Sequence, residues 1–159
     1  MFIIHFLQGL PNWLISMVIS AVPIIELRGG IPLALTVLNM QVLPALIFCI
    51  IGSVIPVFPI FWFLDVSTRY AHKIPVLARF LDWLFARTRA RSEQIKKYEL
   101  IGLILFIAIP LPVTGVWTGT VAAFLFGLSR WKTFVAAMVG TTIAGLIMTI
   151  GSLGIKALF

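Results

Sequence analysis

Long uncharged stretches alternate with short polar breaks along this chain. Charged side chains are absent between Gly29 and Leu64, between Leu100 and Ser129, and between Thr133 and Ile155. The chain is 61% hydrophobic, and its mean hydropathy is +1.13. An apolar share this far above that of soluble domains indicates an all-α integral membrane protein.

The first candidate span is Val42–Leu64. At about 1.5 Å per residue, a helix of this length crosses a hydrocarbon core of about 30 Å. We expect Asp65 to end it and Gly52 to let a neighbouring helix approach closely. Prolines cannot donate a backbone hydrogen bond, so three of them are expected to kink this span: Pro44, Pro56 and Pro59.

The second candidate span is Thr133–Ile155, with Lys156 at its far end. Small residues recur on it at four-residue spacing, which places them on one face of a helix: Ala136, Gly140 and Ala144. Such a ridge is typical of tight helix packing in membranes.

Two other apolar stretches are interrupted. Trp13–Ile25 is too short to cross and stops at Glu26 and Arg28, the only charges in the first 64 residues. A short run and a polar turn, Asn39–Gln41, follow. Leu100–Ser129 is broken in its middle by Pro110–Gly119. This second stretch could be one kinked span or a re-entrant hairpin, which is tolerated where protein encloses it.

Loop charges favour the hairpin. Basic residues crowd residues 66–98, and Arg130 and Lys132 follow the second broken stretch. A hairpin returns to the side it left, so both basic segments, 66–98 and 129–132, would be cytoplasmic in a multi-pass protein of the cell membrane. Within 66–98 we predict an amphipathic helix opening at Pro75 and lying at the headgroup level. No nucleic-acid motif accompanies these charges, so we expect contact with anionic lipid headgroups and no nucleic acid.

The two halves resemble each other. Ala21-Val-Pro23 matches Ala108-Ile-Pro110 at an offset of 87, and Ile51-Gly52-Ser53 matches Val139-Gly140-Thr141 at an offset of 88. We predict one membrane domain over 1–159, with an inverted repeat of re-entrant hairpin plus transmembrane helix. Repeat 1 covers 1–64, the basic linker 65–98 and repeat 2 99–159. Many secondary transporters have this arrangement.

The breaks supply the candidate binding site for substrate or proton. Burial favours the neutral acid at Glu26 and Arg28 favours the carboxylate, so Glu26 could exchange a coupling proton. The Arg28 guanidinium suits a phosphate or carboxylate, and helix N-termini expected after Gly30 and Gly115 add backbone N–H groups. The site is predicted to comprise Glu26, Arg28, Gly29, Gly30, Pro32, Pro110, Pro112, Thr114, Gly115, Trp117, Thr118 and Gly119. Mutual neutralisation of Glu26 and Arg28, Thr–carbonyl bonding and simple packing of Trp117 are the structural alternatives.

The paired motifs Glu26-Leu-Arg-Gly-Gly-Ile-Pro32 and Pro110-Leu-Pro-Val-Thr-Gly-Val-Trp-Thr-Gly119 resemble the small multidrug export protein family. That family is distantly similar to the DedA/VTT membrane proteins. The resemblance implies two inverted re-entrant hairpins and movement of polyprenyl-phosphate or other phospholipids across bilayers, often coupled to protons. The chain is shorter than typical DedA proteins.

Other chemistry has little support in the sequence. No catalytic motif appears, so we expect no enzyme, and neither a metal nor a cofactor beyond a coupling proton or sodium ion. Cys49 is expected to be a buried small hydrophobe, and His5 and His72 to be interfacial or solvated. The N-terminus lacks a signal-peptide pattern and is expected to belong to the mature protein. Alternatives to a DedA-like flippase are an exporter of drug-like amphiphiles and a non-transporting partner or assembly subunit. Two spans are few for a transport path, so a homodimer or larger assembly is expected.

Overall fold

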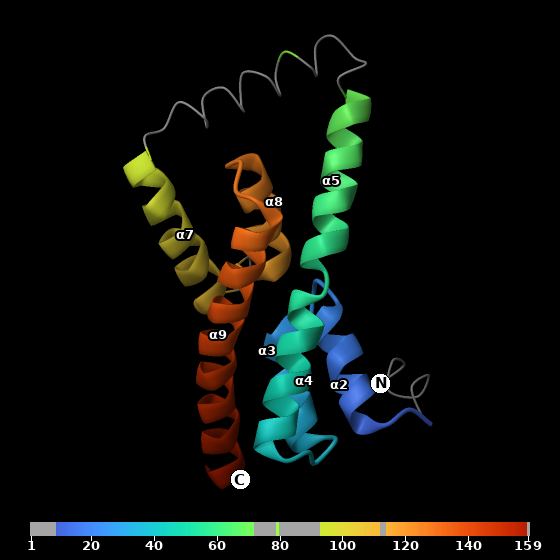
Figure 1. Cartoon of the computed structure of the whole chain (residues 1–159). Coiled ribbons are helices and arrows are strands. Elements are labelled where there is room, and N and C mark those ends of the chain that lie inside the picture. Colours follow the sequence, from blue (N-terminus) through green and yellow to red (C-terminus); the bar gives the residue numbers. More distant parts are fainter. Residues whose placement is uncertain (1–8, 72–78, 80–92, 112–113, 159) are drawn as a thin grey trace. The chain divides into compact units, whose positions relative to one another are not determined.

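The computed structural model describes residues 9–71, 79, 93–111 and 114–158, and every regular element in that part of the chain is helical. The chain forms two packing units, one of residues 1–55 with 141–159 and one of residues 56–140. The helices, labelled in Figure 1, are α2 (Asn12–Ala21), α3 (Glu26–Thr36), α4 (Val42–Val54), α5 (Val57–Ala71), α7 (Glu93–Ala108), α8 (Val116–Leu125) and α9 (Arg130–Leu158).

In the first unit, α2 and α3 form an antiparallel hairpin. The Asn12 side-chain amide, at the start of α2, donates to the carbonyl of Leu38, just beyond the end of α3, at 3.2 Å. Near the other end, Gly30 of α3 lies against the Ser20 hydroxyl of α2. The two helices have 10 and 11 residues, or about 15–17 Å. Each is therefore about half the thickness of a hydrocarbon core.

Helix α4 packs along this hairpin (Figure 1), and small residues allow the close approach. Gly52 lies directly on the backbone carbonyl of Met17 in α2, where a Cβ would overlap it. Beside it, the Ser53 hydroxyl donates to the Ser20 carbonyl at 3.2 Å. Cys49 is fully buried, as its apolar sequence neighbours indicated. The prediction that Gly52 admits a neighbouring helix is confirmed.

The second unit contains α5, α7, α8 and the first part of α9. Gly119 of α8 lies against Ile107 near the end of α7, where a Cβ would come within 2.9 Å of the Ile107 side chain. Gly140 of α9 lies on the same Ile107 and on the carbonyl of Ile104. Ring pairs join α5 to its neighbours, with Phe61 and Phe124 centred 5.7 Å apart.

Two stretches, Val42–Tyr70 and Arg130–Gly154, are long and apolar enough to cross a membrane. The first differs from the sequence prediction in two ways. Only Pro56 coincides with a break, between α4 and α5, whereas Pro44 and Pro59 are the third residues of α4 and α5. Proline is tolerated in the first turn because those N–H groups have no partner within the helix.

Asp65 does not end the first span, because α5 continues to Ala71. The second span begins at Arg130 and continues through Lys156 to Leu158, beyond the predicted ends. Its small-residue ridge is buried: Ala136 is 0% exposed and Ala144 6%, and Gly140 is buried as well.

Large apolar side chains cover much of the outer surface. Ile24 is 92% exposed, Ile150 73% and Trp62 69%. A soluble monomer rarely exposes so much apolar area, whereas a lipid-facing surface requires it. The predicted amphipathic helix opening at Pro75, and with it His5 and His72, lies outside the described residues. The single domain over 1–159 and its repeat boundaries at 64/65 and 98/99 stay predictions.

The glycine contact between α2 and α4 can be tested with a matched pair of substitutions. Gly52→Ala places a methyl group against the Met17 carbonyl, and overpacking of this kind costs about 1–3 kcal/mol. Gly102→Ala meets nothing within 4 Å in α7 and should gain up to about 1 kcal/mol of helix propensity. Thermal unfolding in detergent should therefore show a lower midpoint for Gly52→Ala alone. Equal midpoints for the two variants would contradict this packing.

Candidate functional site

The first break is a short turn that ends in a strained glutamate. Residues 22–25 connect α2 to α3, and the Glu26 N–H donates to the Val22 carbonyl at 2.9 Å. Glu26 has φ +46°, in the left-handed region. Its side chain is buried, with 9% of the residue exposed. A non-glycine residue in this conformation costs on the order of 1–3 kcal/mol, and such residues gather at functional sites.

Helix α3 starts at Glu26, so the prediction of a helix N-terminus after Gly30 is wrong. Gly29, Gly30 and Pro32 all lie inside α3. A glycine occupies this helical position because its missing side chain makes room for Ser20. Cys49 Sγ also lies 3.4 Å from where a Cβ would be. Glycine here serves close packing rather than a turn.

Arg28 lies half-buried in the first turn of α3. Glu26 and Arg28 are two positions apart at the start of the same helix. Pro32, four residues after Arg28, cannot donate to the Arg28 carbonyl, so the regular helical ladder is interrupted one turn past the break. An acid, a guanidinium and an irregular backbone therefore adjoin within one apolar segment.

The second break, Ile109–Gly115, lies in the second unit and is stabilised by Thr114. The Thr114 hydroxyl donates to the Ile109 carbonyl at 2.7 Å and accepts from the Leu111 N–H at 3.2 Å. Thr114 thus bonds backbone groups of the break, as the structural alternative of Thr–carbonyl bonding expects. Gly115 then has φ +151° and caps α8, so the helix N-terminus expected after Gly115 is confirmed.

The other predicted residues of this break have varied settings. Gly119 is buried against α7, Pro110 and Trp117 are half-buried, and Thr118 is exposed. The Thr118 hydroxyl lies 3.5 Å from the Gly115 carbonyl, a weak contact. Pro112 lies outside the described residues. Glu26 and Arg28 belong to one packing unit and the second break to the other, so their convergence on one site stays a prediction.

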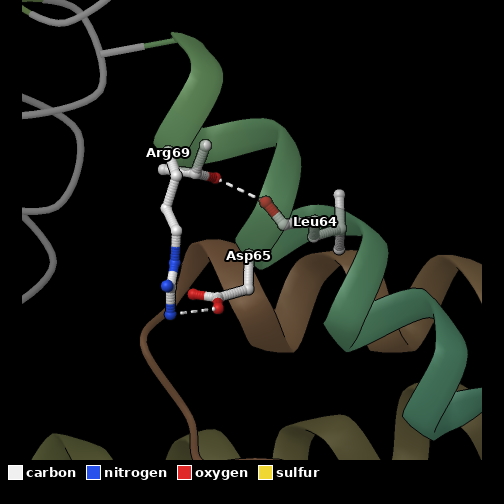
Figure 2. Close-up of polar contacts among 4 residues, drawn as sticks. Leu64, Asp65 and Arg69 are labelled. Atoms are coloured by element: carbon white, nitrogen blue, oxygen red, sulfur yellow. Dashed lines mark hydrogen bonds and ion pairs between the residues drawn. The ribbon is translucent and has the colours of Figure 1, made fainter.

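The sequence analysis missed a charged and aromatic cavity in the second unit. Figure 2 shows Arg69 turned back along α5 toward Asp65, with Nη2 and Oδ2 2.9 Å apart. The four-residue spacing of Asp65 and Arg69, typical of a helical ion pair, was the available signal. We expected Asp65 to end the helix and therefore overlooked it. Within the described residues, no cluster of three or more His, Cys, Asp or Glu could hold a metal ion.

The short α2–α3 hairpin, the apolar surface and the two long apolar stretches indicate an integral membrane protein of the all-helical class. A family model described as "Putative small multi-drug export protein" matches residues 26–147. The chain belongs to this family, as its motifs indicated, and is thereby a membrane transporter or exporter in general terms. The match begins at Glu26, where the first break ends, and includes the whole second break. Comparisons with curated proteins and with solved structures found no significant match.

The strain at Glu26 predicts different effects for two substitutions. Glu26→Gln keeps the left-handed backbone, whereas Glu26→Gly removes its steric cost. Glu26→Gly should therefore be more stable than Glu26→Gln by about 1 kcal/mol in detergent unfolding. Asn39→Gly is the control, because Asn39, at φ +48°, tolerates this region better and should gain less. A Glu26→Gly variant no more stable than Glu26→Gln would contradict the strain.

Thr114 gives a second test. Thr114→Val loses the hydroxyl bonds to Ile109 and Leu111 and should lower the free energy of unfolding by about 1 kcal/mol, whereas Thr114→Ser should retain it. Thr118 is exposed, so Thr118→Val should have the smaller effect on stability. If Thr114→Val and Thr118→Val unfold at the same temperature, Thr114 does not hold the break.

Proposed function

We propose that this protein exports an anionic amphiphile through a site built around Glu26 and Arg28, with Glu26 carrying a coupling proton. The observation behind the proposal is Glu26 itself, which is buried and left-handed at a helix break. An ionisable residue costs about 2.5–3.5 kcal/mol at the centre of a membrane, and its backbone conformation adds on the order of 1–3 kcal/mol. Stability alone gives no reason to keep an acid there.

Arg28 supports an anionic substrate. Its guanidinium is always charged and suits a phosphate or carboxylate. Because α3 starts at Glu26, Arg28 lies in the first turn, where the partial positive charge of a helix N-terminus also favours an anion. A proton on Glu26 would remove the negative charge next to this anion site. Protonation would thus favour substrate binding, and deprotonation its release.

Corresponding close contacts in the two units support the proposed inverted repeat. Gly52 lies on the Met17 carbonyl and Gly140 on the Ile104 carbonyl. Met17 and Ile104 are 87 positions apart, the offset that relates Ala21-Val-Pro23 to Ala108-Ile-Pro110. In the same way, Gly30 lies on Ser20 and Gly119 on Ile107, again 87 positions apart. These contacts are internal to each unit. In them α7, α8 and α9 take the places of α2, α3 and α4.

The proposed repeat gives Glu26 a counterpart. At an offset of 89, the buried residues Leu27, Gly30, Ile31 and Ala34 of α3 correspond to Val116, Gly119, Thr120 and Ala123, all buried in α8. Glu26 then corresponds to Gly115, and both have positive φ. The first half therefore has a glutamate where the second has a glycine. A backbone bend shared by both halves would have gained an acid in one of them.

The membrane arrangement follows from helix lengths. The α2–α3 pair is too short to cross and returns on itself, as expected of a re-entrant hairpin. We extend the same proposal to α7 and α8, with the basic segments 66–98 and 129–132 cytoplasmic and the protein acting as a homodimer or larger assembly. Two substrate classes fit this proposal: phospholipids, as in DedA-like proteins, and the drug-like amphiphiles that the family description suggests.

Proteoliposome transport tests the site. An acidic fluorescent lipid in the inner leaflet, with a proton gradient imposed, should move faster with wild-type protein than in empty vesicles. Glu26→Gln should lose the response to the gradient. Arg28→Gln should lower the transport rate by at least about tenfold, the effect of losing one hydrogen bond to a charged group. Asp65→Asn, a neutralisation in α5 at a residue outside the proposed transport site, should keep most transport.

Two results would count against this proposal. Wild-type rates in both Glu26→Gln and Arg28→Gln would remove the site. Transport of neither acidic lipids nor drug-like amphiphiles by wild-type protein would favour a partner or assembly subunit that does not transport.

A further inference from the structure

A cavity of about 1170 Å³ lies within the second unit. Its described lining consists of residues 58–69 of α5, Glu99 of α7, the end of α8, the turn that follows it and the start of α9. All of these residues fall between Pro56 and Gly140. Sites for drug-sized molecules measure about 300–1,000 Å³, so this cavity can hold a molecule with a substantial apolar body. It is separate in the chain from Glu26 and Arg28.

The apolar wall of the cavity is aromatic. Phe58 lies with its ring centre 5.6 Å from Trp131 in an edge-to-face arrangement, and Phe61 is similarly placed on Phe124. Interlocked rings form a stiff surface that accepts chains or rings of varied shape. The aromatic lining residues are Phe58, Phe61, Trp62, Phe124, Phe126 and Trp131.

The charged residues of the lining leave an excess of positive charge at one edge. Asp65 and Arg69 neutralise each other in their ion pair, and among the lining residues that the structure describes Glu99 is the other carboxylate. Arg130 and Lys132 are exposed, and neither forms an ion pair with any residue that the structure describes.

Arg130 and Lys132 also occupy an unfavourable position in their helix. Both lie in the first turn of α9, where the helix dipole disfavours cations by about 0.3–1 kcal/mol. An anion held between them would offset this repulsion and also meet the N-terminal end of the helix. An organic cation would gain only Glu99 and the ring faces, against two uncompensated positive charges.

We propose that this cavity binds a single-chain anionic amphiphile, with its apolar part on the aromatic wall and its acidic head between Arg130 and Lys132. The site differs from the proposed transport site at Glu26, and binding here requires no transport. A negative binding result would therefore count against this site alone, and a negative transport result against the Glu26 site alone.

Native mass spectrometry of purified protein released from a neutral detergent can count bound molecules. Dodecyl phosphate should bind saturably at one molecule per chain. Dodecyltrimethylammonium, with the same chain and the opposite charge, should bind on the order of tenfold more weakly, and inorganic phosphate should not compete at equal concentration. The last comparison separates an amphiphile site from a site for free phosphate.

Variants then locate the site. The double substitution Arg130→Gln with Lys132→Gln should raise the Kd for dodecyl phosphate on the order of tenfold, because the charged contacts are lost. Arg79→Gln removes one positive charge at an exposed position outside the described lining and should bind like wild type. Trp131→Ala should weaken the binding of dodecyl phosphate, because it removes one ring from the aromatic wall.

Three outcomes would overturn the proposal. The first is equal binding of the cationic and anionic amphiphiles. The second is full competition by inorganic phosphate alone. The third is an unchanged Kd in the double variant while its thermal unfolding matches that of Arg79→Gln, since the protein is then folded and the basic pair plays no part.

Discussion

Backbone polar groups freed by a helix break must find other partners, and both breaks of this chain supply them from nearby residues. At the first break a turn closes from Glu26 to the Val22 carbonyl, and at the second the Thr114 hydroxyl bonds the backbone. Glycines let the helices beside each break pack closely against each other. The interruptions are therefore held by packing within each unit, and the first one carries an ionisable residue.

Much of the fold could be predicted because apolar length and charge position have direct physical consequences. Both long apolar stretches, both breaks, the packing role of Gly52 and the buried ridge from Ala136 to Ala144 followed from the sequence. The errors came from treating residue types as breakers without regard to context. Pro44 and Pro59 are accommodated in the first turns of their helices. Position 30 lies inside α3 and is a glycine because a side chain there would overlap Ser20.

The candidate site was predictable in its residues but not in its geometry. Two charges in an apolar segment identified Glu26 and Arg28, yet no sequence pattern indicates a left-handed glutamate or a helix that starts at it. The aromatic cavity was missed for a related reason. Its described members come from three separated parts of the chain, residues 58–69, Glu99 and residues 124–132, and only folding brings them together. Whether the second break joins the first stays a prediction.

Chemical labelling of Glu26 tests the central claim most directly. A hydrophobic carbodiimide reacts with protonated carboxyl groups inside membranes, whereas a water-soluble one reaches carboxyls in contact with water. In protein reconstituted in lipid, mass spectrometry should find Glu26 modified by the hydrophobic reagent, less so as the pH rises. Asp65, whose side chain is 55% exposed, should instead follow the water-soluble reagent. Modification of Glu26 by the water-soluble reagent alone would contradict a buried, proton-carrying acid at the helix break.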